Sequence, residues 1–482
     1  MNKRHSYIVI IFLFVIISGY SQTTTEKWIA TPQDETMENM TYLYSDILFL
    51  VSYRGEQAAN YVEKFTNYSN VLYKSDFNLN FSDSLFIDEI DNYDILVKSF
   101  LRVDNTGIMY WGKALEKNTQ DEQLCLLWFD EDLNLVDNLI LGSPDTLEVI
   151  SDAIMCTNGN LLFAGTTSFQ MLQGNYLLWE FDENLNEVKK VFFEETVEDF
   201  PTVIEIPGTD KFHFIVGFNT FQFDSDLNYD TTYVFPSDIN IHPQPQNKLF
   251  NDFDYIKTGL FLSAPIPGSP WEMDMAFSVM DENATVLNTY TFGIPDSTDS
   301  PGKLDFITTD TIFFAGTRNI SYNPVEDSWV SLFTTNLQGE VLNHQFWGGG
   351  GQYSFSDLLA LPDGGFLLAM TKWDYEANPE TVTRDLFLVT ENYGNPITKT
   401  NNPEFKSDIT VYPNPGKDII RISAGIDGLH FKLLDLNLNV VAEGDFNGET
   451  TINVSQFPKG IYIYEISQES RILNRGKWVK QF

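Results

Sequence analysis

The stretch Asn160–Asn186, NLLFAGTTSFQMLQGNYLLWEFDENLN, contains the unit from which most of this chain is built. It opens with a short apolar run that ends in glycine, Asn160–Gly165, and continues through a polar loop to a second apolar run and an Asp-rich turn, Asp182–Asn186. Short apolar and aromatic runs bounded by Gly, Asn and Asp are typical of β-strands joined by tight turns. The stretch therefore predicts neighbouring antiparallel strands.

The same unit recurs along the middle of the chain. Its opening run occurs seven times, in Ile47–Ser52, Gly107–Gly112, Asn160–Gly165, Phe212–Gly217, Gly259–Ser263, Thr311–Gly316 and Gly365–Met370. Its turn also occurs seven times, in Asp76–Asn80, Asp130–Asn134, Asp182–Asn186, Asp224–Asn228, Asp281–Thr285, Asn336–Glu340 and Glu391–Asn395. Successive turns begin 42 to 57 residues apart, which leaves room for about four short strands in each unit. A four-stranded sheet repeated at this spacing is typical of a β-propeller blade.

We therefore predict an all-β chain in which residues 23–395 form a seven-bladed β-propeller. Six blades and an irregular first unit remain an alternative, because Ile47–Ser52 lacks the glycine ending. The small residues that end the other runs suggest that these runs are the inner strands, where blades converge. This middle part resembles exported bacterial propeller repeats, and that resemblance bears on the fold alone, since propellers support binding, scaffolding and catalysis.

The first 22 residues have the pattern of a secretory signal peptide. Lys3, Arg4 and His5 precede an uncharged apolar run, Tyr7–Ile17, and small polar residues follow it. The run is too short to cross a bilayer, and no longer apolar run occurs later in the chain. We expect an exported protein without a transmembrane span.

The chain is strongly acidic, with a formal net charge of −39. The first 22 residues hold only basic charges, and Asp408–Phe482 holds 8 Lys and Arg against 9 Asp and Glu, so the negative charge belongs to the middle part. Such a surface repels nucleic acid and anionic membranes and favours cations and basic or neutral partners.

Candidate sites of chemistry in the middle part are weak. Cys125 and Cys156 are expected to fill strands as small apolar residues, with a disulfide as the alternative. The spacing of Asp130, Asp132 and Asn134 is that of calcium ligands, but the glycine and the bidentate glutamate of a calcium loop are missing, so we interpret the Asp-rich turns as hairpins without metal. We therefore expect no cofactor, with calcium at these turns as the alternative.

Three further features of the sequence are weak candidates for function. The run Gly348–Gly351 lacks the Lys-Ser/Thr ending of a phosphate-binding loop and is interpreted as a flexible connection between blades. The four histidines that follow the signal peptide lie in unrelated contexts and form no recognisable catalytic motif: His213, His242, His344 and His430. Four tryptophans in loops are candidates for stacking on sugars or on partner side chains: Trp271, Trp329, Trp347 and Trp373.

The C-terminal part differs in composition. Residues 396–407 indicate a linker, and residues 408–482 contain short alternating runs that predict a small β-sandwich. Its motifs Val411–Pro415, Phe431–Asp435, Asn453–Tyr462 and Lys477–Lys480 resemble the type A C-terminal sorting domain of the type IX secretion system. One departure concerns a turn that in the family usually has the pattern Asp-x-x-Gly-Lys. In this chain the turn begins with Asp435, and Leu438 and Asn439 stand in place of the glycine and the lysine.

The resemblance implies recognition by the type IX secretion machinery, passage across the outer membrane, and then release or attachment at the cell surface. The sorting-motif residues that it assigns are Tyr412, Pro413, Asn414, Pro415, Asp435, Gly460, Tyr462, Lys477 and Lys480. For the whole chain we predict a secreted or surface-exposed propeller that binds an unidentified surface ligand, glycan or protein and is not an enzyme. The alternatives are a polysaccharide-acting enzyme with carboxylates at the propeller channel and a structural or adhesion component.

Overall fold

The computed structural model describes residues 23–392 and 410–480, apart from short gaps at 32, 44–45, 55–67, 105–106, 120–121, 131, 143–147, 168–173, 183, 194–200, 237–240, 263–272, 294–297, 321–325, 363, 378–381, 413–415, 418, 425–427, 435–439 and 469–470. The chain divides into two compact units, Met1–Thr398 and Lys399–Phe482. The regular elements described are strands and one short 3-10 helix, η1 (Pro207–Thr209), which confirms the all-β prediction. The predicted signal peptide and linker lie outside the described residues.

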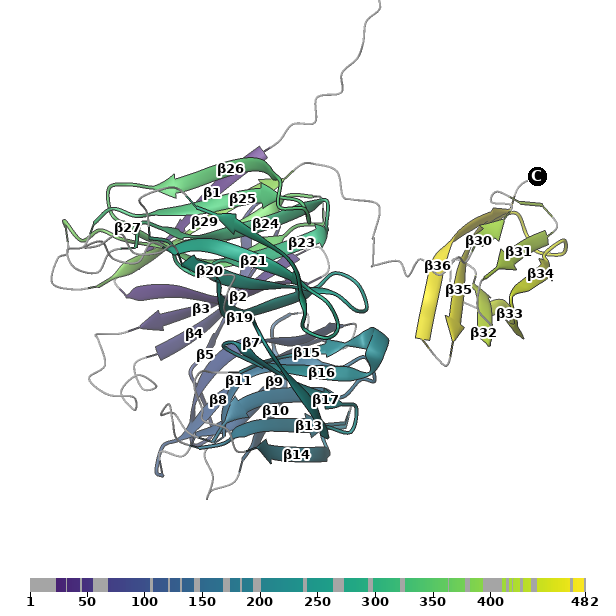
Figure 1. The fold of residues 1–482 in the computed structure, drawn as a ribbon, viewed down its shortest axis with the longest axis horizontal. Coiled ribbons are helices and arrows are strands. Elements are labelled where there is room, and N and C mark those ends of the chain that lie inside the picture. Colours follow the sequence, from purple (N-terminus) through teal and green to yellow (C-terminus); the bar gives the residue numbers. More distant parts are fainter. Residues whose placement is uncertain are drawn as a thin grey trace, which may run out of the picture. The chain divides into compact units, whose positions relative to one another are not determined.

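The first unit contains antiparallel sheets, which we number in chain order (Figure 1). Sheet 1 contains β2 (Asp34–Leu43), β3 (Asp46–Arg54), β4 (Tyr68–Ser75) and β5 (Phe81–Ile87). Sheet 2 has four long strands, which we count as its first to fourth: β7 (Tyr93–Asp104), β8 (Gly107–Glu116), β9 (Glu122–Phe129) and β10 (Leu135–Leu141). The two-residue β6 (Glu89–Ile90) pairs with the start of β7. Sheet 3 contains β11 (Val149–Met155), β12 (Leu161–Thr166), β13 (Tyr176–Phe181) and β14 (Glu187–Phe193).

The remaining sheets of this unit follow the same up-and-down order. Sheet 4 contains β15 (Thr202–Ile206), β16 (Lys211–Val216), β17 (Asn219–Asp224) and β18 (Tyr229–Val234). Sheet 5 contains β19 (Ile241–Leu249), β20 (Tyr255–Leu262), β21 (Met273–Met280) and β22 (Val286–Phe292). Sheet 6 contains β23 (Lys303–Thr308), β24 (Thr311–Arg318), β25 (Trp329–Thr335) and β26 (Val341–Gly348). Sheet 7 contains β27 (Gln352–Ala360), β28 (Phe366–Trp373), β29 (Arg384–Asn392) and β1 (Thr23–Ile29).

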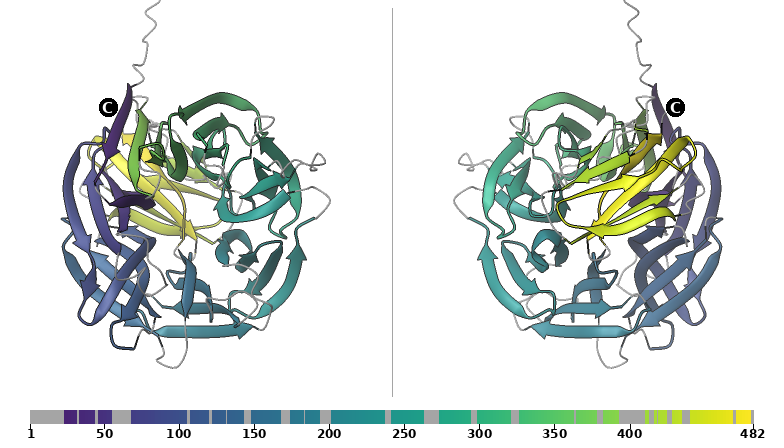
Figure 2. Two further views of the ribbon diagram at one scale, coloured as in Figure 1. Left: turned by 90° about the vertical axis from the view of Figure 1, so that its left-hand side faces the viewer. Right: turned by 90° about the vertical axis from the view of Figure 1, so that its right-hand side faces the viewer.

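The sheets form a closed ring. The first strand of each sheet contacts the first strand of the next, through the series β2, β7, β11, β15, β19, β23 and β27, and β27 contacts β2 again. Figure 2 shows the sheets arranged around a common centre. Apolar side chains fill the spaces between successive sheets, as where Phe277 of sheet 5 packs against Phe314 of sheet 6. The N-terminal unit is therefore a β-propeller.

The two ends of this unit meet in sheet 7. Strand β1 pairs with β29 in antiparallel register from Thr23 opposite Asn392 to Ile29 opposite Leu386, so the start of the chain supplies the outermost strand of the last sheet. Beside this pair, Arg384 donates two hydrogen bonds to Asp34 of sheet 1, from Nε to Oδ1 at 2.7 Å and from Nη2 to Oδ2 at 2.6 Å. The pairing of β1 with β29 thus completes sheet 7, and the bidentate ion pair joins sheet 7 to sheet 1.

A buried carboxyl lies at the same junction. Glu35 on β2 is fully buried, its Oε1 accepts the backbone N–H of Thr31 at 2.8 Å, and its Oε2 has no hydrogen-bond partner among the described residues. Burial raises the pKa of Glu35 to about 7, against an ordinary 4.5. The unfolded chain therefore loses this proton at lower pH than the folded chain, which costs stability as the pH rises from about 4.5 to about 7.

We predict that Glu35→Gln removes this pH dependence. Relative to the unchanged protein, the unfolding free energy of the variant should rise by about 1 to 2 kcal/mol between pH 4.5 and pH 7.5, because glutamine has no proton to lose. Urea unfolding across this pH range measures the difference. Glu38→Gln, which alters a carboxylate paired with Lys98 on β7, is the control. A difference between Glu35→Gln and the unchanged protein that does not vary with pH would contradict the assignment.

The seven apolar runs found in the sequence are the second strands of the sheets and not the inner ones. They fall in β3, β8, β12, β16, β20, β24 and β28. Their glycines have another cause: a Cβ on Gly112 would lie 2.5 Å from the carbonyl oxygen of Leu96, and one on Gly165 would lie 2.4 Å from that of Val149. Both carbonyls belong to an irregular, bulged first strand of the same sheet, which approaches the glycine closely.

The Asp-rich turns connect the third and fourth strands. In each of the first five the fourth residue has a left-handed backbone, at Leu79, Leu133, Leu185, Leu227 and Ala284, with φ between 53° and 62°. Burial of the leucine side chains in Leu79, Leu133 and Leu227 offsets the cost of the left-handed backbone. The turn predicted at Glu391–Asn395 begins within β29, and its residues 393–395 lie outside the described part.

The second unit contains two sheets. One contains β30 (Thr410–Tyr412), β31 (Ile419–Ser423) and β34 (Glu449–Asn453). The other contains β33 (Val440–Phe446), β32 (Leu429–Leu434), β35 (Gly460–Gln468) and β36 (Arg471–Lys480). Side chains of both sheets, among them Ile422 and the fully buried Trp478, share one hydrophobic core. This unit is a small β-sandwich, as the sequence predicts.

Candidate functional site

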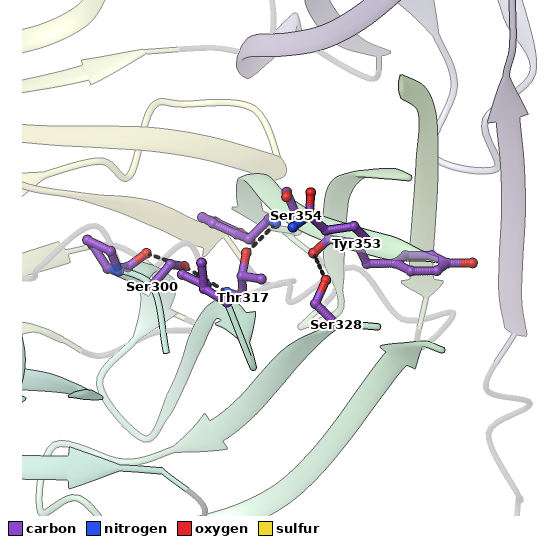
Figure 3. Close-up of a pocket in the computed structure, with 9 residues that line it drawn as sticks. Ser300, Thr317, Ser328, Tyr353 and Ser354 are labelled. Carbon is purple, nitrogen blue, oxygen red and sulfur yellow. Dashed lines mark hydrogen bonds between the residues drawn. The ribbon is translucent and has the colours of Figure 1, made fainter. Parts of the chain in front are cut away.

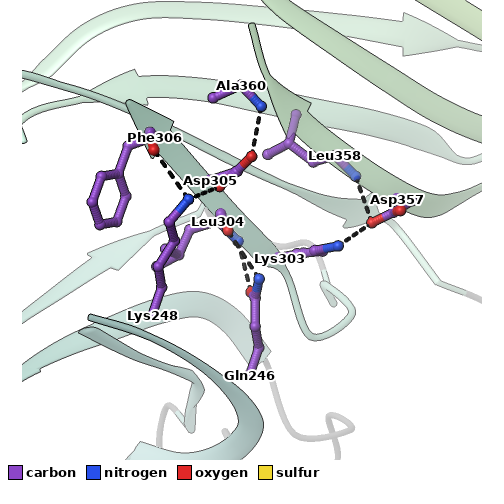
Figure 4. A network of polar contacts seen from close by, with 9 residues as sticks. All are labelled: Gln246, Lys248, Lys303, Leu304, Asp305, Phe306, Asp357, Leu358 and Ala360. Carbon is purple, nitrogen blue, oxygen red and sulfur yellow. Dashed lines mark hydrogen bonds and ion pairs between the residues drawn. The ribbon is translucent and has the colours of Figure 1, made fainter. Parts of the chain in front are cut away.

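Charged side chains of the innermost strands join one sheet to the next. Lys248 of β19 pairs with Asp305 of β23, and Lys303 of β23 pairs with Asp357 of β27 (Figure 4). Asp305 Oδ2 also accepts the backbone N–H of Ala360 at 2.7 Å. Asp305 is therefore held by a lysine and a backbone donor of the two neighbouring sheets, which is the contact pattern of a structural clamp. Asp357 accepts Lys303 and the backbone N–H of Leu358 at Oδ1, and its Oδ2 has no hydrogen-bond partner among the described residues.

The same pattern occurs between sheets 3 and 4. Asp152 of β11 accepts the backbone N–H of Val203 of β15 at Oδ2, 2.9 Å away, and that of Ala153 at Oδ1. Burial raises the pKa of Asp152 to about 6. A glycosidase site requires two carboxylates across one bond, one as an acid and one as a base or nucleophile. In the described part of the ring, burial raises the pKa of four carboxyl groups: Glu35 on sheet 1, Asp152 on sheet 3, and Asp357 and Asp385 on sheet 7. Of these, Asp357 is paired with Lys303.

The histidines and cysteines are dispersed. His213 on β16 is buried against Tyr255, and burial lowers the pKa of its imidazole to about 4. His344 lies on β26 and stacks on Phe333, whereas His242 belongs to β19 and His430 to the second unit. Cys125 and Cys156 are both buried and unbridged, and burial raises the pKa of both thiols. The alternative of a disulfide is not realised.

The tryptophans predicted to be exposed are partly covered. Trp329, Trp347 and Trp373 are half-buried, and the ring of Trp347 packs edge-on to Phe366. Trp271 lies outside the described residues.

A pocket opens between sheets 6 and 7, at the end of β24 and the start of β27. Its volume is about 290 Å³. The described residues that line it are Ser300, Pro301, Thr317, Ile320, Ser328, Gln352, Tyr353, Ser354 and Phe355. Five of these side chains carry an aliphatic hydroxyl or an amide, three are apolar, the ninth is the phenol of Tyr353, and none is a carboxylate, imidazole, ammonium or guanidinium. In a chain with a net charge of −39, this pocket has an uncharged wall.

Hydrogen bonds fix the pocket wall across the two sheets (Figure 3). Thr317 Oγ1 of sheet 6 accepts the backbone N–H of Phe355 of sheet 7 at 2.8 Å, and Ser328 Oγ donates to the carbonyl oxygen of Tyr353 at 2.6 Å. Ser300 Oγ accepts the backbone N–H of Thr317 at 2.9 Å. Each hydroxyl is thus held by backbone groups that belong to ordered strands.

The four-glycine run forms the connection from β26 to β27, immediately before the pocket wall. All four glycines have positive φ, and Asp327 accepts the backbone N–H groups of Gly350 at 2.9 Å and Gly351 at 2.8 Å. The hydroxyl of Tyr375 donates to the same carboxylate at 2.9 Å. These bonds lower the pKa of Asp327. The run is therefore an inter-sheet connection, as predicted, but a carboxylate of the same chain holds it in place.

The Asp-rich turns use their carboxylates as acceptors within the turn. Asp130 Oδ1 accepts the backbone N–H groups of Asp132 at 3.0 Å and Asn134 at 2.8 Å, and its Oδ2 accepts Asn134 Nδ2 at 3.0 Å. The bonds from Asn134 and Asp132 lower the pKa of Asp130. Three N–H donors directed at one carboxylate occupy the positions that a cation would need.

We expect EDTA to leave the melting temperature of the protein unchanged within about 1 °C, because these turns are held by N–H donors. By contrast, an ion present at 100 times its dissociation constant adds about 2.7 kcal/mol to the unfolding free energy when it binds. That gain corresponds to a rise of several degrees in the melting temperature. Differential scanning calorimetry with and without chelator measures this, with added calcium as the reverse experiment. A drop of several degrees that calcium restores would overturn the structural interpretation of the turns.

The residues assigned to the sorting motif have different environments. Tyr412 ends β30, and Gly460 and Lys480 are opposite each other on β35 and β36. The hydroxyl of Tyr462 donates to the carbonyl oxygen of Pro458 at 2.6 Å, and Lys477 lies opposite Ile463. Pro413, Asn414, Pro415 and Asp435 lie outside the described residues.

Lys480, one of the residues assigned to the sorting motif, is buried in the second unit. It is only 8% exposed, and its Nζ donates to the carbonyl oxygens of Val454 and Ser455. Beside it on β36, Trp478 is fully buried. The end of β36 thus closes the core of the second unit and is not wholly available to a partner.

The comparison with protein families decides the identity of this unit. Residues 410–481 match the family model of the secretion system C-terminal sorting domain. The second unit is a type IX sorting domain. The chain is accordingly an exported protein that reaches the outer cell surface or the medium, and its sorting domain interacts with the type IX machinery. None of the helices in the described part is long and apolar enough to span a membrane.

The propeller is similar in fold to many solved structures, and no curated protein matches the sequence. One is the WD40 domain of Pan2 from Neurospora crassa, with 11% identity, a TM-score of 0.41 and coverage of 74% of this chain and 89% of that one. Another is the β-propeller domain of the Trilobed protease from Pyrococcus furiosus, with 10% identity, a TM-score of 0.42 and coverage of 77% and 98%. The endosialidase of phage phi92 has 9% identity and a TM-score of 0.40, and the match covers 95% of this chain and 88% of that one. Similarity at this level carries no information on activity.

Proposed function

We propose that the propeller is a binding module that acts outside the cell and recognises its ligand without converting it. The observation that carries this proposal is the pocket between sheets 6 and 7, which has a hydroxyl-rich wall and, among its described lining residues, no carboxyl, imidazole, ammonium or guanidinium group. Acid–base catalysis needs a group whose pKa lies near the working pH within hydrogen-bond reach of the reacting atoms. The titratable group of the described lining is the phenol of Tyr353, whose pKa is raised further by burial, so the pocket is better suited to recognition.

The surrounding charge supports a partner that is neutral or basic. The acidic surface repels nucleic acid and anionic glycans and attracts cationic partners over a range set by the ionic strength. The association rate with a basic partner should therefore fall with added salt, whereas binding of a neutral ligand should be nearly independent of salt.

The rival function is hydrolysis or elimination on a polysaccharide by carboxylates of the innermost strands. The raised pKa of Asp152, about 6, is the observation in its favour, because a general acid must hold its proton near neutral pH. Against it, both carboxyl oxygens of Asp152 accept backbone N–H groups. A structural or adhesion role is a third possibility, and it predicts neither turnover nor a saturable small ligand.

A single set of incubations separates these functions. The purified full chain is incubated with polysaccharides, peptides and esters, and products are analysed while binding is measured by calorimetry. We expect saturable binding and no product. Turnover that disappears in Asp152→Asn or Asp357→Asn, but persists in the outer-strand control Asp83→Asn, would replace the binding proposal with the enzyme.

A further inference from the structure

We propose that the pocket between sheets 6 and 7 binds one neutral sugar unit, a proposal that rests on the binding function proposed above. The pocket of about 290 Å³ is at the small end of the range of ligand sites, which suits a single ring and not an extended chain segment.

The hydrogen-bonding capacity that remains in the wall is mixed. Thr317 Oγ1 accepts a backbone N–H, so its own hydrogen is left to donate, whereas Ser328 Oγ donates to a carbonyl and keeps lone pairs that can accept. No contact within the described residues occupies the hydroxyl of Ser354, which can do both. A ligand that matches this wall must donate and accept at closely spaced positions, as sugar hydroxyls do.

Other ligand classes fit less well. An inorganic anion or a carboxylate only accepts hydrogen bonds and would need a cationic partner, and an ammonium only donates and would need a carboxylate. The described lining offers neither charge. The apolar side chains of Pro301, Ile320 and Phe355 provide a surface on which the C–H face of a sugar ring can pack. A purely polar ligand has no such apolar face.

The carboxylate of Asp327, which lies next to the pocket, does not contact the ligand in this proposal. Asp327 precedes Ser328 in the chain, but its two oxygens are taken up by Gly350, Gly351 and Tyr375. The bonds hold the connection that leads into Gln352–Phe355, so Asp327 is a positioning residue for the wall. The ligand therefore meets hydroxyl and amide groups at the wall and not this negative charge.

The test uses the full chain and pairs of chemically matched probes. Methyl glucoside and N-acetylglucosamine are the neutral probes, and glucuronic acid and glucosamine are the anionic and cationic controls, each titrated by calorimetry and by saturation-transfer NMR. We expect the neutral probes to bind and each charged analogue to bind at least about tenfold more weakly, since a charge in a site without a partner is costly. Equal or tighter binding of a charged analogue would overturn the proposal.

The site is located by two serine variants. Ser354→Ala removes a hydroxyl that holds no other part of the fold, and we expect affinity for the neutral probe to fall about fivefold. Ser225→Ala is the matched control, because Ser225 lines a second, more open pocket between sheets 3 and 4 that also contains Glu180 and Lys189. Affinity lost in Ser225→Ala and kept in Ser354→Ala would assign the sugar to the second pocket and overturn the proposal.

Further outcomes separate this proposal from the binding function itself. Tighter binding of a linear tetrasaccharide than of its single unit, still sensitive to Ser354→Ala, identifies the end of a polymer as the source of the sugar, whereas equal binding identifies the free sugar. Saturable binding of a peptide or another non-sugar ligand, with no response to sugars, overturns the sugar proposal and leaves the binding module intact. Turnover sensitive to an inner-strand carboxylate overturns both.

Discussion

A chain that ends at Ser407 should accumulate in the periplasm with its propeller folded. The sorting domain is the part of the chain that the type IX machinery is expected to recognise, and its core is separate from that of the propeller, since the two units are compact on their own. Export should fall by at least about tenfold, whereas the truncated protein should keep the near-ultraviolet circular dichroism and melting transition of the propeller.

The measurement is immunoblotting of periplasm, outer membrane and medium from cells that carry the truncated or the full chain. Trp478→Ala is a second variant, because it removes the largest fully buried side chain of the sorting domain and leaves the propeller unchanged. Tyr229→Ala, an exposed aromatic on the outer propeller strand β18, is the matched control and should be exported normally. Normal amounts of truncated protein in the medium of intact cells would refute the role of the sorting domain.

Asp34→Ala should lower the unfolding free energy of the propeller by about 2 to 4 kcal/mol. The substitution removes both hydrogen bonds to the Arg384 side chain and leaves a partly buried guanidinium without its carboxylate, and loss of one partner of such a pair is costly. The effect is large because the pair lies at the point where the first and last sheets meet.

Urea unfolding and melting temperature measure this loss. Asp46→Ala is the control, because Asp46 pairs with Lys74 at 3.4 Å in a more exposed position, where ion pairs are worth less than about 1 kcal/mol. If both variants lose the same stability, the ion pair makes no special contribution to the closure of the ring.

Much of the propeller could be predicted because its signals are local. Each apolar run pairs with the strand that leads into the following turn, as Leu161–Thr166 pairs with Tyr176–Phe181 just before the turn at Asp182, so these neighbouring strands can be identified without knowledge of the rest. The prediction that these runs are the inner strands was wrong. The true inner strands, such as β7 and β11, are bulged, and their mixed polar and apolar sequences lack a clear alternation.

Features that depend on distant segments could not be predicted. The pocket combines residues from the segments that begin or end β23, β24, β25 and β27, and none of these carries a motif. The backbone of Leu133 is left-handed because its side chain fills a core between sheets, so tertiary packing overrides the local preference that favours asparagine. Likewise, only the folded ring brings Asp34 and Arg384 together across 350 residues of sequence.

The pairing of β1 with β29 also has a kinetic consequence. The last sheet cannot be completed until the first strand of the unit and the strand about 360 residues later have both emerged and found each other, and such non-local contacts slow folding. Until then β29 presents an unpaired edge to other chains. Refolding in vitro should therefore show a late step in which the amide hydrogens of Leu386–Asn392 become protected from exchange after those of the other sheets. A nascent propeller should be most prone to aggregation just before that step.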